Sequence, residues 1–163
     1  MFRHSFFGLV AALLAAILMA PTALAANPHF VVAPSFTVNP NGTVTATGSV
    51  AGLGGENVDV VLTVELSVEV ICTNPAGNIA PGQTQQTTVT GEQSNLEVKN
   101  GRVDFTVTSA APTLDPTLTP KQLGCPNNKW TASIGEVTIE SATLQIIQPA
   151  GSDNVVLEET FTP

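Results

Sequence analysis

Apolar and polar residues alternate along much of this chain with the two-residue period of a β-strand. In the clearest run, VDVVLTVELSVEVI, every second residue from Val58 to Val70 is apolar, while Asp59, Glu65 and Glu69 lie between them. Successive side chains of a strand point to opposite faces, so the run predicts a long strand with one buried and one solvated face. After the N-terminal region, no segment has the period of an amphipathic helix.

Asn-Gly pairs and one change of phase predict where the strands turn or bend. The segment LEVKNGRVDFTV indicates a hairpin with its turn at residues 100–101, and FTVNPNGTVTATGSV indicates a second hairpin or strand-turn-strand around residues 40–42. In WTASIGEVTIESATLQIIQ the apolar phase changes between Ile139 and Ala142, which predicts a bulge or bend within a strand.

The strand pattern predicts an all-β fold. About seven or eight strands follow one another without the crossover helices that parallel strands require, which favours an antiparallel immunoglobulin-like sandwich. The longest irregular segment is SAAPTLDPTLTPKQLGCPNNK, residues 109–129, whose four prolines exclude a central strand. A loop of this length is either functional or held in place by another part of the chain.

The first residues have the layout of a secretory signal peptide. In MFRHSFFGLVAALLAAILMAPTALA a basic start precedes an apolar run at 6–20 and a small-x-small end. We expect cleavage after Ala25, or else after Ala26, which leaves residues 26–163 as a single secreted domain with no membrane segment. An uncleaved membrane anchor is the alternative, but the apolar run is short for a span.

Charge limits the classes of partner. Removal of Arg3 with the signal peptide leaves four Lys and Arg against thirteen Asp and Glu, a net charge of −9. An acidic surface repels phosphate backbones, so we expect neither a nucleic acid nor an anionic membrane as partner. Acidity otherwise favours solubility, and it identifies no ligand.

The two cysteines, Cys72 and Cys125, are expected to form an intramolecular disulfide, as a lone pair in an exported protein usually does. The bond would close a loop of about 50 residues and stabilise the fold by roughly 4 kcal/mol in the chain-entropy model. A metal-binding or redox-active pair is the alternative. The sequence has neither a CxxC spacing nor a nearby histidine to support it.

The segments after the two cysteines, CTNPAGN and CPNNKW, are similar in character. Both combine Asn with Pro, which are turn formers. If the cysteines pair, the two turns lie side by side, and Asn74, Asn78, Asn127 and Asn128 can satisfy the backbone groups that the turns expose. Trp130 is then expected to pack beneath the bridge, or else to form a ligand-stacking surface.

These segments also carry a resemblance. GLGG, CTNPAGNIAPGQ, KNGRVDFTV and GCPNNKWTASIGEVTIESATLQI resemble a group of small exported bacterial proteins, common in actinobacteria, with CTNPGGN-PGQ and CPNPNW segments. The resemblance covers roughly residues 45–148 and implies a secreted β-sandwich without an established activity. The chain departs from the pattern at Ala76, where the group has Gly, and at Asn128, where Asn-Pro-Asn becomes Pro-Asn-Asn.

Few residues could support catalysis, and we predict no catalytic, metal-binding or cofactor-binding residue. His29 is the one histidine after the signal peptide, and we expect it in a loose N-terminal arm, unsuited to a catalytic triad or a multi-histidine zinc site. Glu65 and Glu69 on one strand would stand about 13 Å apart, too far for a pair that cleaves glycosides. A cross-strand partner such as Asp104 or Glu140 is not assigned by the sequence.

The sequence therefore predicts a secreted, non-enzymatic structural or interaction module for an unknown protein or cell-envelope ligand. Its edge strands and the loop 109–129 would supply the binding surface. Two alternatives remain. A glycan-binding module is disfavoured because the chain has one Trp and no Tyr for a stacking platform. A hydrolase would need two carboxylates from among Glu65, Glu69 and Glu140.

Overall fold

The computed structural model describes residues 27–163; the expected signal peptide and its predicted cleavage site lie outside the described residues. This part of the chain is all-β. Its strands are β1 (His29–Val38), β2 (Val44–Ala51), β3 (Val58–Thr73), β4 (Ile79–Pro81), β5 (Gln85–Leu96), β6 (Arg102–Thr108), β7 (Thr131–Ile147) and β8 (Val155–Phe161). A membrane-spanning helix is absent from residues 27–163.

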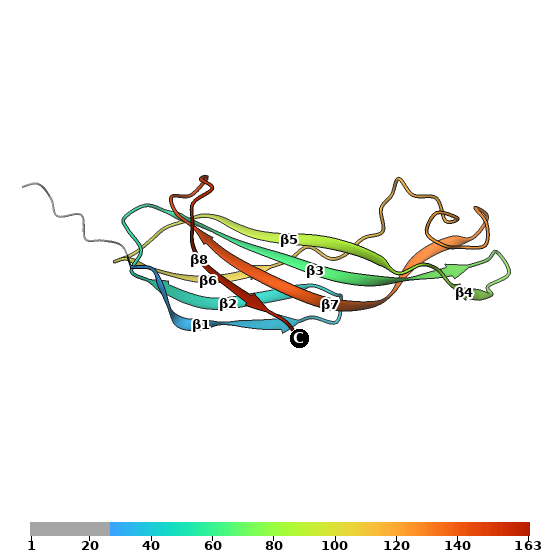
Figure 1. The fold of residues 1–163 in the computed structure, drawn as a ribbon, viewed down its shortest axis with the longest axis horizontal. Coiled ribbons are helices and arrows are strands. Elements are labelled where there is room, and N and C mark those ends of the chain that lie inside the picture. The colour runs from blue at the N-terminus through green and yellow to red at the C-terminus, as the bar shows by residue number, and fades with distance from the viewer. Residues whose placement is uncertain (1–26) are drawn as a thin grey trace, which may run out of the picture.

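The strands form two antiparallel sheets (Figure 1). The first has the order β1-β2-β6, and the second has the order β4-β3-β7-β8 with β5 also paired to β3. Because β7 pairs along the whole of β3, both β4 and β5 lie end to end on the other side of β3. The predicted antiparallel sandwich of seven or eight strands with one disulfide is confirmed.

The alternation seen in the sequence places β3 at the centre of the core. Its even-numbered residues from Val58 to Val68 are almost fully buried, and they face the apolar side chains of the other sheet. The residues that the three-stranded sheet contributes are Val44, Ala46, Val50, Val103, Phe105 and Val107. Burial of apolar surface between two sheets is the main stabilising term of such a fold.

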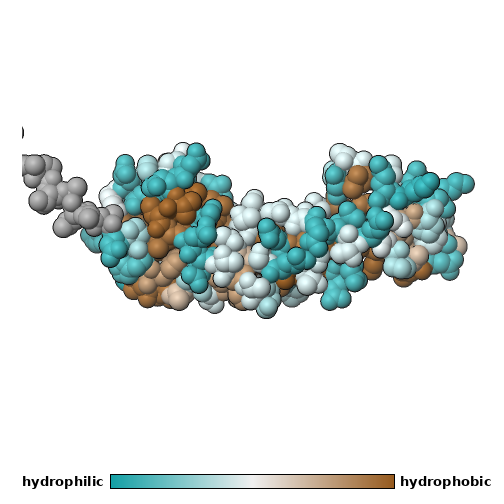
Figure 2. Space-filling model, in the orientation of Figure 1, coloured by the Kyte–Doolittle hydropathy of each residue, from teal (hydrophilic) through white to brown (hydrophobic). Residues whose placement is uncertain are grey.

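The molecule is elongated because β3 and β7 are longer than the sandwich. These strands have 16 and 17 residues, and they continue past the first sheet into a second, smaller core of Val70, Cys72, Leu123 and Cys125. Figure 1 shows the two long strands running between both ends, and Figure 2 shows two thicker ends joined by a narrower waist. We call the end that holds the second core the bridged end.

The predicted irregularity in the region of residues 131–148 is confirmed. The pairing of β3 with β7 shifts register twice, once at Glu65–Leu66 and once at Val68–Val70. Each shift adds residues on β7, so that its apolar side chains return to the buried face after the bulge.

One of the two predicted hairpins is confirmed and the other is wrong. β1 and β2 form the hairpin around residues 39–43. Asn100 and Gly101 have the positive φ angles of a tight turn, 52° and 72°, but only Lys99 and Arg102 pair across it. Beyond this single residue pair, β5 pairs with β3 and β6 pairs with β2, because the buried face of β6 completes the three-stranded sheet.

The expectation of a loose N-terminal arm at His29 is also wrong. His29 is the first residue of β1, where it pairs with Ala51. Along the same side of the sandwich, β1 and β8 approach each other, and the rings of Phe36 and Phe161 stack with centroids 5.3 Å apart. The stack covers the side of the core between β1, at the edge of the first sheet, and β8, at the edge of the second sheet.

The end opposite the bridge is fastened by Asp59, a carboxylate that is only 7% exposed. Its two oxygens accept hydrogen bonds from the backbone N–H of Asn95, at 2.7 Å, and of Gly151, at 2.6 Å. The end of β5 and the β7–β8 loop are thereby held to the start of β3. The partners satisfy a carboxylate that would otherwise be costly to bury.

Candidate functional site

The predicted disulfide between Cys72 and Cys125 is present. The two Cα atoms are 5.5 Å apart, and both residues are buried. The bond joins the last part of β3 to the loop 109–129, and the two sulfur atoms lie within the second core. The long loop is therefore held to the sheet by a covalent bond.

Trp130 packs against the second core with its side chain partly exposed. That core consists of Val70 and Leu123 together with the two bridged cysteines. This position places the single Trp of the chain beside the bridge, which is one of the two roles considered from the sequence.

Asn74 and Asn78 organise the turn that follows Cys72. The Asn74 side-chain oxygen accepts hydrogen bonds from the backbone N–H of Ala76, at 2.9 Å, and of Asn78, at 2.8 Å. The Asn78 carbonyl accepts a bond from the Asn74 N–H at 3.0 Å. The Asn74 side chain satisfies the backbone of the turn as the sequence suggested, whereas Asn78 takes part through its backbone N–H and carbonyl.

The turn after Cys125 has the same construction. The Asn127 side-chain oxygen accepts a bond from the Lys129 N–H at 2.9 Å, and that of Asn128 accepts one from the Lys121 N–H at 3.1 Å. These two asparagines therefore hold the end of the loop 109–129 in shape beside the disulfide.

A short connection between β4 and β5 locks the loop to the sheet. The Gly82 N–H donates to the Val70 carbonyl at 2.7 Å, and the Gln83 N–H donates to the Leu123 carbonyl at 2.9 Å. Gly124 has a φ of +90°, and a side chain there would collide with Gln83. Glycine is required at that position both by the left-handed backbone and by the close approach.

Next to this locked loop lies a cavity of about 200 Å³, between the beginning of β5 and the loop. The lining residues are Val68, Gln85, Gln86, Thr87, Thr113, Leu114, Asp115 and Leu118. Its base is Val68, which is 1% exposed, and Leu114 and Leu118 are half-buried between the cavity and the second core. We call this space the β5 cavity.

The polar groups around the β5 cavity leave several hydrogen-bonding atoms available. Gln85 donates its side-chain N–H to the Gln83 carbonyl at 3.2 Å, so its carbonyl oxygen remains an acceptor. Among the described residues, the hydroxyls of Thr87 and Thr113 have no hydrogen-bond partner. An apolar base with a few polar groups around it is the usual composition of a ligand site.

Asp115 contributes a negative charge to the same rim. Its carboxylate accepts hydrogen bonds from the Thr117 hydroxyl, at 2.6 Å, and from the Thr117 N–H, at 2.8 Å. The hydroxyl bond, followed by the backbone bond, lowers the pKa of Asp115 below its ordinary value of 3.8. The carboxylate is therefore ionised at neutral and at mildly acidic pH.

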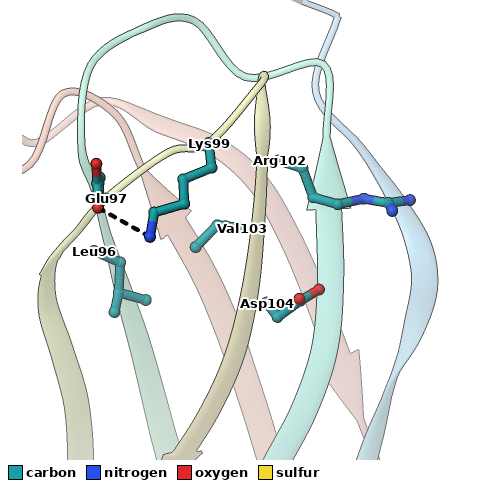
Figure 3. Close-up of a pocket in the computed structure, with 6 residues that line it drawn as sticks. All are labelled: Leu96, Glu97, Lys99, Arg102, Val103 and Asp104. Carbon is teal, nitrogen blue, oxygen red and sulfur yellow. Dashed lines mark ion pairs between the residues drawn. The ribbon is translucent and has the colours of Figure 1, made fainter.

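A second cavity, of about 310 Å³, lies at the β5–β6 turn (Figure 3). Lys99 forms an ion pair with Glu97 at 3.3 Å, and the two side chains are 73% and 71% exposed. Figure 3 shows Arg102 pointing away from Lys99. Exposed ion pairs contribute little, and the charges here do not converge on one position, so this cavity is the weaker candidate.

The carboxylates considered for hydrolysis lie elsewhere. Glu65 accepts a hydrogen bond from the Ser141 hydroxyl at 3.1 Å, and Glu140 accepts one from the Gln86 amide at 3.0 Å. Glu65, Glu69 and Glu140 are exposed and line neither cavity. Asp104 lies in the other sheet and lines the cavity at the β5–β6 turn.

The sequence pointed to the disulfide, the turn asparagines and Trp130, but not to the β5 cavity. Its residues come from 85–87 and 113–118, which the fold brings together. The one available signal was the long proline-rich loop, which forms the outer wall. Comparison of the chain with protein-family models, curated proteins and solved structures gave no match.

Proposed function

We propose that this protein is a secreted, non-enzymatic interaction module that binds a protein ligand at its bridged end. The signal-like N-terminus supports export, and a disulfide fits an oxidising compartment. The observation that carries the proposal is the β5 cavity, because its outer wall is a long loop fixed to β3 by the Cys72–Cys125 bond.

A covalently fixed wall favours binding for an energetic reason. Ordering a loop when a ligand arrives costs conformational entropy, and a wall that is already ordered reduces that cost. The disulfide, the turn asparagines and the connection at residues 82–83 all restrain the loop 109–129. Long irregular loops in compact domains are usually either functional or disordered, and this one is restrained and borders a cavity.

The amide and hydroxyl groups at the rim support a glycan as the second candidate. Gln85, Thr87 and Thr113 could bond to sugar hydroxyls. The apolar base of the cavity, made by Val68, Leu114 and Leu118, supports instead a ligand with an apolar side chain. Within residues 27–163, no aromatic side chain lines the cavity. The protein ligand therefore remains the stronger proposal.

A cavity-filling substitution tests the proposal. The purified protein is used to select ligands from a displayed random-peptide library and is applied to an immobilised glycan array. Thr113→Trp fills the β5 cavity, and Thr47→Trp makes the same change on an exposed strand position of the other sheet. We expect peptide ligands whose binding falls at least about tenfold in Thr113→Trp and is kept in Thr47→Trp.

Each of the other outcomes of the selection would contradict part or all of the proposal. Glycans that bind, and are lost in Thr113→Trp, would replace the protein ligand by the second candidate. Ligands of either kind that bind Thr113→Trp as well as the unchanged protein would remove the β5 cavity as the site. An absence of any selected ligand would contradict the proposal.

A further inference from the structure

We infer that the ligand is an extended peptide that adds as a strand to the open edge of β5 and inserts one apolar side chain into the β5 cavity. The inference rests on the proposed function and specifies how that site recognises its partner. Strand addition uses main-chain hydrogen bonds for affinity and pockets beside the edge for specificity. Both parts are present at this edge.

The first part is a row of backbone groups directed away from β3. In an antiparallel ladder, the N–H and C=O of alternate residues point to opposite edges of the strand. The Thr90 carbonyl accepts a hydrogen bond from the Ala110 N–H at 2.9 Å, so it points away from β3. The register with β3 is regular from Gln93 to Gln85, which places the N–H and C=O of Thr88 and Gln86 on that same edge.

These outward groups have no hydrogen-bond partner within the described part of the chain. The chain leaving β6 donates a backbone hydrogen bond to β5 at Ala110, and the buried Pro112 follows. Beyond this point, the β5 cavity separates residues 113–118 from the start of β5. An added strand would therefore continue a pairing that the fold itself begins at Thr90.

The second part is the position of the cavity relative to that edge. Gln85 and Thr87 point toward the buried face of the sheet and line the cavity. Every second side chain of an added strand would point the same way. One such side chain would lie over Val68, between Leu114 and Leu118. A cavity of about 150 Å³ already accepts a benzene ring, so about 200 Å³ accommodates one aliphatic or aromatic side chain.

Charge indicates which residues flank that side chain. Asp115 lies on the rim, and Glu140 of β7 is hydrogen-bonded to Gln86 across β3. The protein is strongly acidic overall. A peptide with Lys or Arg beside its apolar residue would be attracted, and an acidic peptide would be repelled.

The other open edges carry features that prevent pairing. β1 has two register shifts and contains Pro34, and β8 carries Glu158 and Glu159. β6 carries Arg102 and Asp104, and β4 has only three residues and ends at Pro81. Bulges, prolines and charges are the usual protections of an edge strand. The segment Gln85–Thr90 has no charge, no proline and no register shift. It is therefore the edge that remains suited to a partner.

The test uses a synthetic peptide taken from the library selection described above. Single N-methylation along the peptide removes one backbone N–H at a time without changing the side chains. We expect affinity to fall about tenfold at every second position and to be unchanged between them. Hydrogen exchange at the Thr88 and Gln86 amides of the unchanged protein should slow when the peptide binds.

A variant of the protein tests the same backbone hydrogen bonds by changing β5 and not the peptide. Thr88→Pro removes an N–H that has no partner in the fold, and proline is tolerated at an edge position. We expect it to weaken the peptide about tenfold, whereas the matched control Thr88→Ala keeps the N–H and the affinity. Circular dichroism confirms that both variants are folded.

The outcomes separate the two proposals. A peptide that is displaced by Thr113→Trp, but shows no alternation on N-methylation and no slowed exchange at Thr88 and Gln86, would overturn strand addition and leave the interaction module standing. Failure to select any peptide would remove both. The N-methylation and exchange experiments use the unchanged protein, so they decide the matter even if Thr88→Pro does not fold.

Discussion

At the scale of single residues, the bridged end is held in shape by polar side chains that bond to nearby backbone. Asn74 and Asn127 do this in the two turns, and Asp115 does it in the wall of the β5 cavity. Each such bond satisfies a backbone donor that a loop would otherwise leave exposed. The sequence predicted the asparagines because Asn beside Pro is a recognisable turn signal. It did not predict Asp115, because its importance depends on the cavity.

Thr117→Ala tests the environment of Asp115. Loss of the hydroxyl donor should raise the pKa of Asp115 toward its ordinary value of 3.8, since that bond is the largest cause of the lowered pKa. In the unchanged protein, the stabilisation from this carboxylate is present above pH 3.8 and fades as the pH falls through the lowered pKa. Carboxyl chemical shifts measured against pH report the change.

The control is Thr119→Ala, since the Thr119 hydroxyl bonds to Gln122 and not to Asp115. It should leave the pKa of Asp115 where it is. An Asp115 pKa that does not move in Thr117→Ala would show that the hydroxyl bond is not formed in solution.

At the scale of the elements, strands with an apolar alternation were predictable and the polar strand was not. β3 was predicted almost to its ends because its buried face is continuous. β5 was missed because its sequence, QQTTVTGEQSNL, has few apolar residues to mark a face. It is a strand because β3 supplies its ladder, and tertiary pairing of this kind overrides local composition. The same polarity leaves its outer edge without the usual protections.

The wrong hairpin at residues 100–101 has a related cause. An Asn-Gly pair predicts the turn, and the turn is there, but it does not say which strands pair on either side. β6 pairs with β2, and in that position its apolar residues Val103, Phe105 and Val107 are buried in the core between the sheets.

Gly91→Ala tests how closely β5 and β6 approach. A side chain at Gly91 would overlap the carbonyl oxygen of Thr108, so the exit of β6 would have to move away from β5. We expect the free energy of unfolding to fall by about 1–3 kcal/mol, as for other overpacking substitutions. Urea denaturation measures it. Gly55→Ala, where the added group has open space, should change it by less than about 0.5 kcal/mol.

At the scale of the whole molecule, two cores of unequal size share the strands β3 and β7. The larger core lies between the sheets and the smaller surrounds the disulfide. The sandwich class and the cysteine pairing were predictable, because the apolar alternation and the number of cysteines can be read directly from the sequence. The division into two cores did not, since it depends on how far β3 and β7 extend beyond the first sheet.

Reduction of the disulfide should weaken the smaller core first. The Cys72–Cys125 bond spans 53 residues, which corresponds to about 4 kcal/mol of loop-closure entropy. Trp130 is the one Trp of the chain and lies at the smaller core, so its fluorescence reports the bridged end. After reduction, we expect its urea transition to occur at lower urea than the transition seen by far-ultraviolet circular dichroism.

In the oxidised protein the two transitions should coincide, as they do for a single cooperative unit. A thiol titration that finds no free thiol before reduction and two after it confirms the starting states. Transitions that move together on reduction would show instead that both cores unfold as one.

The positions of the chain ends have a practical consequence. β1 begins at the end far from the disulfide, and Phe161 of β8 pairs with Ala142 midway along β7 (Figure 1). A tag, a linker or an anchoring surface attached at either terminus would therefore lie clear of the loop 109–129. The paired strands β3 and β7 would then hold the bridged end, where we propose the binding site, away from the point of attachment.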